Sequence, residues 1–216
     1  MSIINDKGGI KHTMRSENNS RVVKEVRIQD EDELEDIIIK DTEIMDSTAR
    51  NIIFREVKFE NAIFTDVDWE NTQFIHVTFN RCDLSNINLS SSTFHYCEFI
   101  NCKLIGTSLI ESSMREVVFR ECQAEYLMLG GSKVKNIDFN ECKLDNSSFN
   151  RCELIKSVFN KCDLVRAEFG NTKLKGIDFS TCNIEAININ LENIKGLKLS
   201  SIQAIEISKL LGIIVV

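Results

Sequence analysis

Apolar residues recur at every fifth position along most of the chain. Every residue whose number ends in 4 or 9, from Leu34 to Leu199, is apolar, which makes 34 consecutive units in one frame. All 13 phenylalanines fall on this frame. A small or β-branched residue mostly stands two positions before each apolar centre, and the remaining positions are mainly polar.

A period of five matches neither the helix period of 3.6 nor the strand period of two. Residues two apart nevertheless share one face of an extended segment. Each unit therefore predicts a short extended piece with two inward side chains, followed by a corner that turns the chain. One such unit cannot bury its apolar face alone, so the pattern predicts a solenoid whose stacked coils bury a continuous core.

A second period of 20 residues describes how the coils stack. Twenty residues are four units, which predicts a coil with four sides. Like residues then stack at about 4.8 Å, and roughly eight coils make a rod about 40 Å long. The predicted core columns are Phe59, Phe79, Phe99, Phe119, Phe139, Phe159 and Phe179, and Cys82, Cys102, Cys122, Cys142, Cys162 and Cys182.

The units resemble those of the pentapeptide-repeat proteins, whose motif is loosely A(D/N)LXX. CDLSN at 82–86, CKLDN at 142–146 and CDLVR at 162–166 are close matches. The resemblance implies an all-β fold, a right-handed quadrilateral β-helix. We expect about eight coils, an N-terminal capping strand and a short C-terminal helix.

The two ends depart from the repeat. Residues 1–20 are polar and predict a mobile arm, and residues 21–33 predict a cap because RVVKEVRI (21–28) alternates like a strand. The β-helix spans 34–199, and 200–216 predict a helix and tail. Ser200 and Gln203 have the spacing of a capping box, and Gly212 is a C-terminal stop.

The last residues, GLKLSSIQAIEISKLLGIIVV (196–216), resemble the ending of the Qnr quinolone-resistance proteins. The resemblance implies a homodimer through this end and a rod that imitates DNA and binds type II topoisomerase. The predicted apolar residues here either cover the last coil or form the dimer interface, two compatible roles: Ile202, Ile205, Leu210 and Leu211. Many Qnr relatives also carry loops that engage the topoisomerase, and this frame has none between 34 and 199.

Charge and composition restrict the expected partners and the expected compartment of the protein. The net charge is −7, which does not favour nucleic acid as a direct partner. The sequence has neither an apolar segment long enough for a signal peptide nor one that could span a membrane. We therefore expect a cytoplasmic protein that binds no membrane and whose eight cysteines are reduced.

No motif for catalysis is found, so we predict neither an enzyme nor a cofactor or metal. The cysteine column could suggest metal or redox work, but zinc needs four converging ligands and a column is a line. The phenylalanine column could stack bases, but its register places it inside. His76, His95 and Tyr96 share one edge without a nucleophile or carboxylate arranged beside them.

Charge is distributed unevenly over the predicted sides. Between residues 42 and 186, the side with the cysteine column carries eight acids and three bases. Its candidate partner-binding residues are Asp66, Asp83, Glu125, Asp145, Asp163 and Glu185. The side centred on Leu34 through Ile194 is balanced overall, but its lower half carries Arg115, Lys133, Lys135, Lys156, Lys173, Lys175 and Lys195. A solvated polar surface is the alternative interpretation of both.

These observations favour a protein that works by binding another protein. The most specific hypothesis is a Qnr-like DNA mimic that binds DNA gyrase or topoisomerase IV. The alternative is a general solenoid scaffold or adaptor, and a weaker hypothesis is a redox sensor built on the cysteines.

Overall fold

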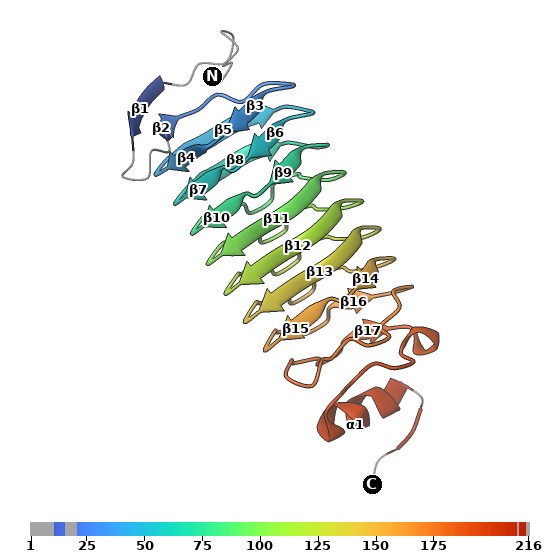
Figure 1. The fold of residues 1–216 in the computed structure, drawn as a ribbon. Helices are drawn as coiled ribbons and strands as arrows, with labels where there is room; N and C mark the ends of the chain where they lie inside the picture. Colours follow the sequence, from blue (N-terminus) through green and yellow to red (C-terminus); the bar gives the residue numbers. More distant parts are fainter. Residues whose placement is uncertain (1–10, 16–20, 211, 215–216) are drawn as a thin grey trace.

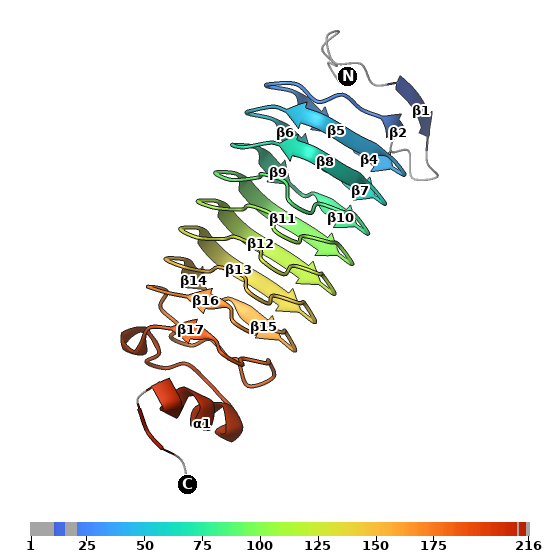
Figure 2. The same ribbon diagram turned by 180° about the vertical axis from the view of Figure 1, so that it is seen from behind.

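The chain winds into a straight rod of stacked coils, seen from two sides in Figures 1 and 2. The structure, a computed structural model, describes residues 11–15, 21–210 and 212–214. Pairing between coils is parallel and offset by 20 residues, so that Leu34 lies beside Phe54 and Phe54 beside Phe74. The same offset continues to the bridge between Asp178 and Lys198. The uninterrupted right-handed solenoid of about eight coils is confirmed.

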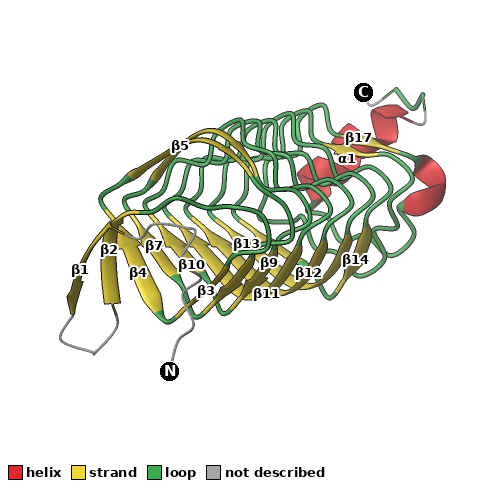
Figure 3. Cartoon of the chain, turned by 90° about the horizontal axis from the view of Figure 1, so that it is seen from above, coloured by secondary structure: helices red, strands yellow, loops and turns green. Residues whose placement is uncertain are grey.

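Each coil has four sides, which Figure 3 shows in a view from the N-terminal end. Side 1 carries the centres Leu34 to Ile194, and side 2 carries Ile39 to Leu199. Side 3, with the centres Ile44 to Ile184, holds the cysteine column. Side 4 carries Ala49 to Ile189.

Regular strands are concentrated on sides 1 and 2. Side 1 contains β3 (Glu33–Glu35), β6 (Ile53–Arg55), β9 (Gln73–Ile75) and β14 (Glu153–Ile155). Side 2 contains β4 (Ile37–Lys40), β7 (Lys58–Glu60), β10 (Thr78–Asn80) and β15 (Val158–Asn160). Three strands run over both sides: β11 (Thr93–Ile100), β12 (Ser113–Arg120) and β13 (Lys133–Asn140). Sides 3 and 4 hold β5 (Glu43–Thr48) and β8 (Ile63–Asp68), and side 4 also β16 (Glu168–Phe169) and β17 (Asn188–Ile189).

The corners use a left-handed backbone conformation at one fixed position. All 28 described non-glycine residues with positive φ have numbers ending in 1 or 6, and all but Glu31 stand two residues after a centre. Such a conformation costs an L-residue roughly 1–2 kcal/mol. Side-chain amides at the corners offset part of this cost by bonding from coil to coil, as Asn71 Nδ2 does to Asn51 Oδ1 at 2.6 Å and Asn61 Nδ2 to Asp41 Oδ1 at 2.8 Å.

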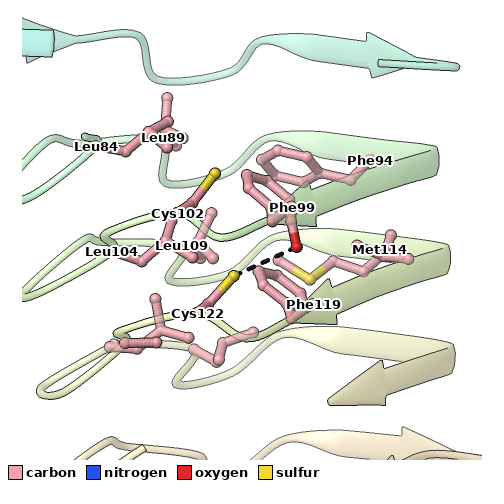
Figure 4. Packing of buried hydrophobic residues seen from close by; sticks show 14 of the residues in the cluster. Leu84, Leu89, Phe94, Phe99, Cys102, Leu104, Leu109, Met114, Phe119 and Cys122 are labelled. Carbon is pink, nitrogen blue, oxygen red and sulfur yellow. Dashed lines mark hydrogen bonds between the residues drawn. The ribbon is translucent and has the colours of Figure 1, made fainter. Parts of the chain in front are cut away.

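The core is a set of side-chain columns that run the length of the rod. On side 2 the rings of Phe79, Phe99 and Phe119 stack at centroid distances of 4.8 and 4.6 Å and are nearly parallel. Figure 4 shows this column beside the leucines and cysteines that fill the opposite half of the core. All eight cysteines are buried and free, as the register predicts.

Where cysteine, serine or threonine stands two positions before a centre, its side chain mostly donates a hydrogen bond as well as filling space. Cys122 Sγ donates to the carbonyl oxygen of Phe99 at 3.3 Å, the bond drawn in Figure 4. Ser132 Oγ donates to the Leu109 carbonyl at 2.8 Å on side 1 in the same way. A buried hydroxyl or thiol at this position can therefore satisfy the carbonyl of a centre residue in the preceding coil, although the hydroxyls of Thr72 and Ser157 have no hydrogen-bond partner among the described residues.

The N-terminal end is covered by a strand, as expected for 21–33. β2 (Arg21–Glu25) pairs with β4 in parallel, with Val22 beside Ile38. Of the segment predicted as a mobile arm, the structure describes only residues 11–15, and these form β1 (Lys11–Arg15), antiparallel to β2.

A 3-10 turn, η1 (Leu191–Asn193), and a helix, α1 (Ser201–Leu210), end the rod. The predicted capping box is present, because the Ser200 N–H donates to Gln203 Oε1 at 2.8 Å and the Gln203 N–H to Ser200 Oγ at 3.3 Å. Gly212 follows the helix with φ of 73°. No helix in the described part of the chain is long and apolar enough to cross a membrane.

Candidate functional site

The acidic residues of side 3 alternate between two outward positions of the repeat. Asp83 and Asp163 precede their centres, whereas Glu125, Asp145 and Glu185 follow theirs. Asp66 is a corner residue with φ of 52°. All six lie on the surface of the same side, as the 20-residue period predicts, but they do not form one cluster.

Glu125, Asp145 and Asp163 form the densest part of the acidic side. Partial burial raises the pKa of Asp145, and the negative charges of Asp163 and Glu125 raise it further. Glu125 Oε2 and Asp163 Oδ1 are shielded from solvent and accept no hydrogen bond from the described residues. The positive charge of Arg166 acts in the opposite direction on the pKa of Asp145, but none of the three carboxylates makes an ion pair with a described residue.

Asp83 behaves differently because it has a cation beside it. Its carboxylate lies 3.4 Å from Lys103 Nζ and accepts the Ser85 N–H at 3.1 Å. Partial burial acts to raise the pKa of Asp83, but the hydrogen bonds from Ser85 and the charge of Lys103 outweigh it and leave the pKa below its usual value. Asp83 thus contributes little free negative charge to side 3.

The described residues contain no group of three or more histidine, cysteine, aspartate or glutamate side chains that could hold a metal ion. His76 and Tyr96 stack ring on ring at 4.8 Å on side 1. The column cysteines are buried in the core.

The thiols are expected to be inert in the folded protein. Burial in apolar surroundings raises the pKa of Cys97 to about 12 and that of Cys152 to about 11. Inside the column, hydrogen bonding with the Cys102 thiol lowers the pKa of Cys82 and Cys122, but both residues are at most 2% exposed. Because an alkylating agent must reach a thiolate to react with it, and all eight cysteines are buried, we expect iodoacetamide at pH 8 to modify none of them before unfolding, and all of them in guanidinium chloride. Intact-protein mass spectrometry measures both, and rapid native modification of any column cysteine would contradict the prediction and favour a redox role.

Two residues of the C-terminal helix that the sequence pattern does not place in the interface lie against the rod. Among the described side chains of α1, Gln203 and Ile207 are buried, at 8% and 7% exposure. Gln203 Nε2 donates to the carbonyls of Phe179 and Cys182 at 2.8 and 2.7 Å. Sequence reasoning identified Gln203 only as a cap, because its second role depends on where the helix meets the last coil.

The residues predicted for a dimer interface point away from the rod where they are described. Ile202 is 75% and Ile205 44% exposed, so neither covers the last coil. Ile213 and Ile214 are exposed nearby. The side chain of Leu210 and the whole of Leu211 lie outside the described residues.

Comparisons with known proteins agree with this architecture. The sequence matches the family described as "Pentapeptide repeat region" over residues 72–149 and 132–208, and "Pentapeptide repeats (8 copies)" over 52–91. No curated protein matches the chain.

Solved structures of other proteins also match the chain. A trypsin-treated variant of QnrB1, described as a plasmid-mediated fluoroquinolone resistance protein, is 14% identical with a TM-score of 0.50. That match covers 87% of this chain and 96% of the other. HetL, described as a pentapeptide repeat protein involved in heterocyst differentiation regulation in the cyanobacterium Nostoc sp. strain PCC 7120, is 11% identical with a TM-score of 0.37 and coverages of 78% and 87%.

Proposed function

Because this chain belongs to the pentapeptide-repeat family, we propose that it is a non-catalytic protein that acts by binding another protein through the acidic side of its rod. The specific partner that we propose is a type II topoisomerase, DNA gyrase or topoisomerase IV. The rod would occupy the basic groove that normally holds DNA and so protect the enzyme from quinolones.

The observation that carries this proposal is the charge of side 3. Eight acids and three bases lie along it between residues 42 and 186, and the carboxylates of Glu125, Asp145 and Asp163 have no ion pair among the described residues. A side with net negative charge on a rigid rod complements a basic groove, and such complementarity accelerates association and selects the partner.

The uninterrupted repeat frame restricts which part of the rod can bind a topoisomerase. Coils 34–199 pair at a constant offset and leave no inserted loop to engage the enzyme. Binding must therefore come from the sides of the rod, and the three unpaired carboxylates are where we expect it to concentrate. The fold similarity to QnrB1 supports the shape of the rod, not the identity of its partner.

A gyrase supercoiling assay tests the proposal. Excess pure protein is expected to inhibit supercoiling or to restore it in the presence of a fluoroquinolone. The triple variant Glu125→Gln, Asp145→Asn, Asp163→Asn is expected to lose this effect. The matched control Glu98→Gln, Glu121→Gln, Asp178→Asn removes the same charge from exposed positions of side 2 and is expected to keep it.

If the wild-type protein leaves gyrase and topoisomerase IV unaffected with and without drug, the topoisomerase proposal is wrong. The alternative, a scaffold or adaptor for another protein, is then favoured. The acidic side would still be expected to bind that partner.

We further propose that the protein is a homodimer through its C-terminal end. The support is the exposed apolar set Ile202, Ile205, Ile213 and Ile214, which lies beside a helix whose buried residues, among the side chains that the structure describes, are Gln203 and Ile207.

A further inference from the structure

Side 1 carries opposite charges in its two halves. The units from 32–36 to 92–96 contain five acids and one base, a net charge of −4. The units from 112–116 to 192–196 contain seven bases and three acids, a net charge of +4. The net charges of the two halves of side 1 are therefore equal in size and opposite in sign.

The basic half is exposed and unpaired. Its seven cations are all exposed, and none of them makes an ion pair with any described residue: Arg115, Lys133, Lys135, Lys156, Lys173, Lys175 and Lys195. Elsewhere on the rod, Lys40, Lys103 and Lys161 bind a carboxylate one coil away. Side 1 thus keeps its cations available to another molecule.

The acids of the acidic half are concentrated in the first coil. Glu33 and Glu35 occupy the two outward positions of β3 and are exposed, with the buried Leu34 between them. Neither makes an ion pair with the described residues, although Arg55 lies beside Glu35 in the strand register. The exposed corner residue Glu56 adds a third carboxylate in the second coil.

We propose that a second copy of this chain binds to side 1, antiparallel, with the first coil of each copy on the eighth coil of the other. A two-fold axis that lies in the interface, along the strand direction, reverses the order of the coils. The axis leaves the strand direction unchanged, so a residue that precedes its centre in one copy faces a residue that precedes its centre in the other. The acidic half of each copy then covers the basic half of its partner.

With coil one opposite coil eight, this symmetry brings specific acidic and basic residues of the two copies face to face. Glu33 faces Lys173, and Glu35 faces Lys175, because each pair occupies the same outward position in coils one and eight. The corner residue Glu56 of coil two faces the corner residue Lys156 of coil seven. The symmetry doubles these three pairs to six, since a two-fold interface is isologous.

Coils four and five of the two copies meet in the middle of the interface. Thr93 then faces Ser113, and larger side chains face one another beside them, His95 with Arg115 and Tyr96 with Glu116. The pairs are surface pairs in high dielectric, so the association must depend strongly on salt. A parallel arrangement would place like charges together, coil on matching coil, which excludes it.

The test uses the full chain in which Ile202→Glu and Ile205→Glu remove the exposed apolar residues of the C-terminal helix, so that only side 1 is measured. Sedimentation velocity at about 25 mM NaCl, where screening extends ~20 Å, is expected to show a concentration-dependent dimer. At about 1 M NaCl, where it extends ~3 Å, the dimer is expected to dissociate. The dimer keeps the length of one rod, which solution X-ray scattering distinguishes from an end-to-end dimer of twice that length.

Charge reversal provides the decisive comparison. Glu33→Lys with Glu35→Lys, and separately Lys173→Glu with Lys175→Glu, each place like charges face to face and are expected to weaken self-association about tenfold or more. An equimolar mixture of the two variants restores every attractive pair and is expected to form a heterodimer. A matched pair on side 2, Glu98→Lys with Asp178→Lys, is expected to leave the dimer intact.

The proposal is overturned if the mixture stays monomeric while circular dichroism shows both variants folded, or if the parent is monomeric at low salt. It is also overturned if the parent stays monomeric and binds duplex DNA in a manner lost in Lys173→Glu with Lys175→Glu, because the basic half would then be a nucleic-acid site.

Discussion

Replacement of Phe119 by alanine is expected to lower the free energy of unfolding by about 3–5 kcal/mol, the range for loss of a fully buried aromatic side chain. Phe119 is 0% exposed, and its ring stacks on Phe99 at 4.6 Å and on Phe139 at 4.7 Å. The cavity would lie in the middle of a column, with neighbouring coils held at the strand spacing by their backbone bonds. The walls therefore cannot collapse to fill it.

The position within the rod makes this effect informative. In a solenoid each coil contacts only its neighbours, so the loss at Phe119 falls on the two interfaces of one coil. Urea denaturation followed by circular dichroism measures the change. Tyr126→Ala is the control, because Tyr126 is 58% exposed at a corner and should cost less than about 0.5 kcal/mol. Equal effects of the two substitutions would contradict the columnar core.

The core columns could be predicted from the sequence because residues 20 apart occupy the same position in successive coils and therefore stack on one another. The apolar centre must point inward in every unit, and any interruption would place a polar residue in the core. Phe119 and Cys122 were therefore assigned to the core correctly. The acidic residues of side 3 also lie on one side, since the same period assigns every outward position to a side.

Other features depend on distances that a pattern does not contain. The left-handed corners hold Glu121, Tyr126 and Arg166 as well as asparagine, so residue type carries little signal for them. The pairing of Asp83 with Lys103 and the isolation of Asp145 follow from which carboxylates meet a cation between coils. The six predicted acidic residues therefore divide into neutralised and unneutralised members, which no count along the sequence distinguishes.

At the C-terminal end of the rod, the structure shows hydrogen bonds that the sequence pattern does not predict. In the repeat, Cys182 Sγ donates to the Phe159 carbonyl, and the Asn183 N–H donates to the Cys162 carbonyl. A further coil would supply the same two donors to the carbonyls of Phe179 and Cys182. The side-chain amide of Gln203 supplies both of them instead. The helix therefore ends the cysteine column by replacing the hydrogen bonds of the missing coil.

Gln203→Ala is accordingly expected to lower the free energy of unfolding by about 2–4 kcal/mol, because it leaves buried carbonyls without these donors and removes half of the capping box. Ser200→Ala removes only the other half of the box and should cost about 1 kcal/mol. Urea denaturation measures both, and amide hydrogen exchange is expected to quicken in α1 and the last coil before the centre of the rod.

The comparison between the two variants decides what Gln203 does. If Gln203→Ala costs no more than Ser200→Ala, the residue is a helix cap and the last coil needs no donors from α1. If the cost is larger and exchange at Phe179 and Cys182 rises selectively, the helix is an integral lid of the solenoid. In that case Ile202 and Ile205, on the part of the helix turned away from the rod, are available for an end-to-end contact without uncovering the core.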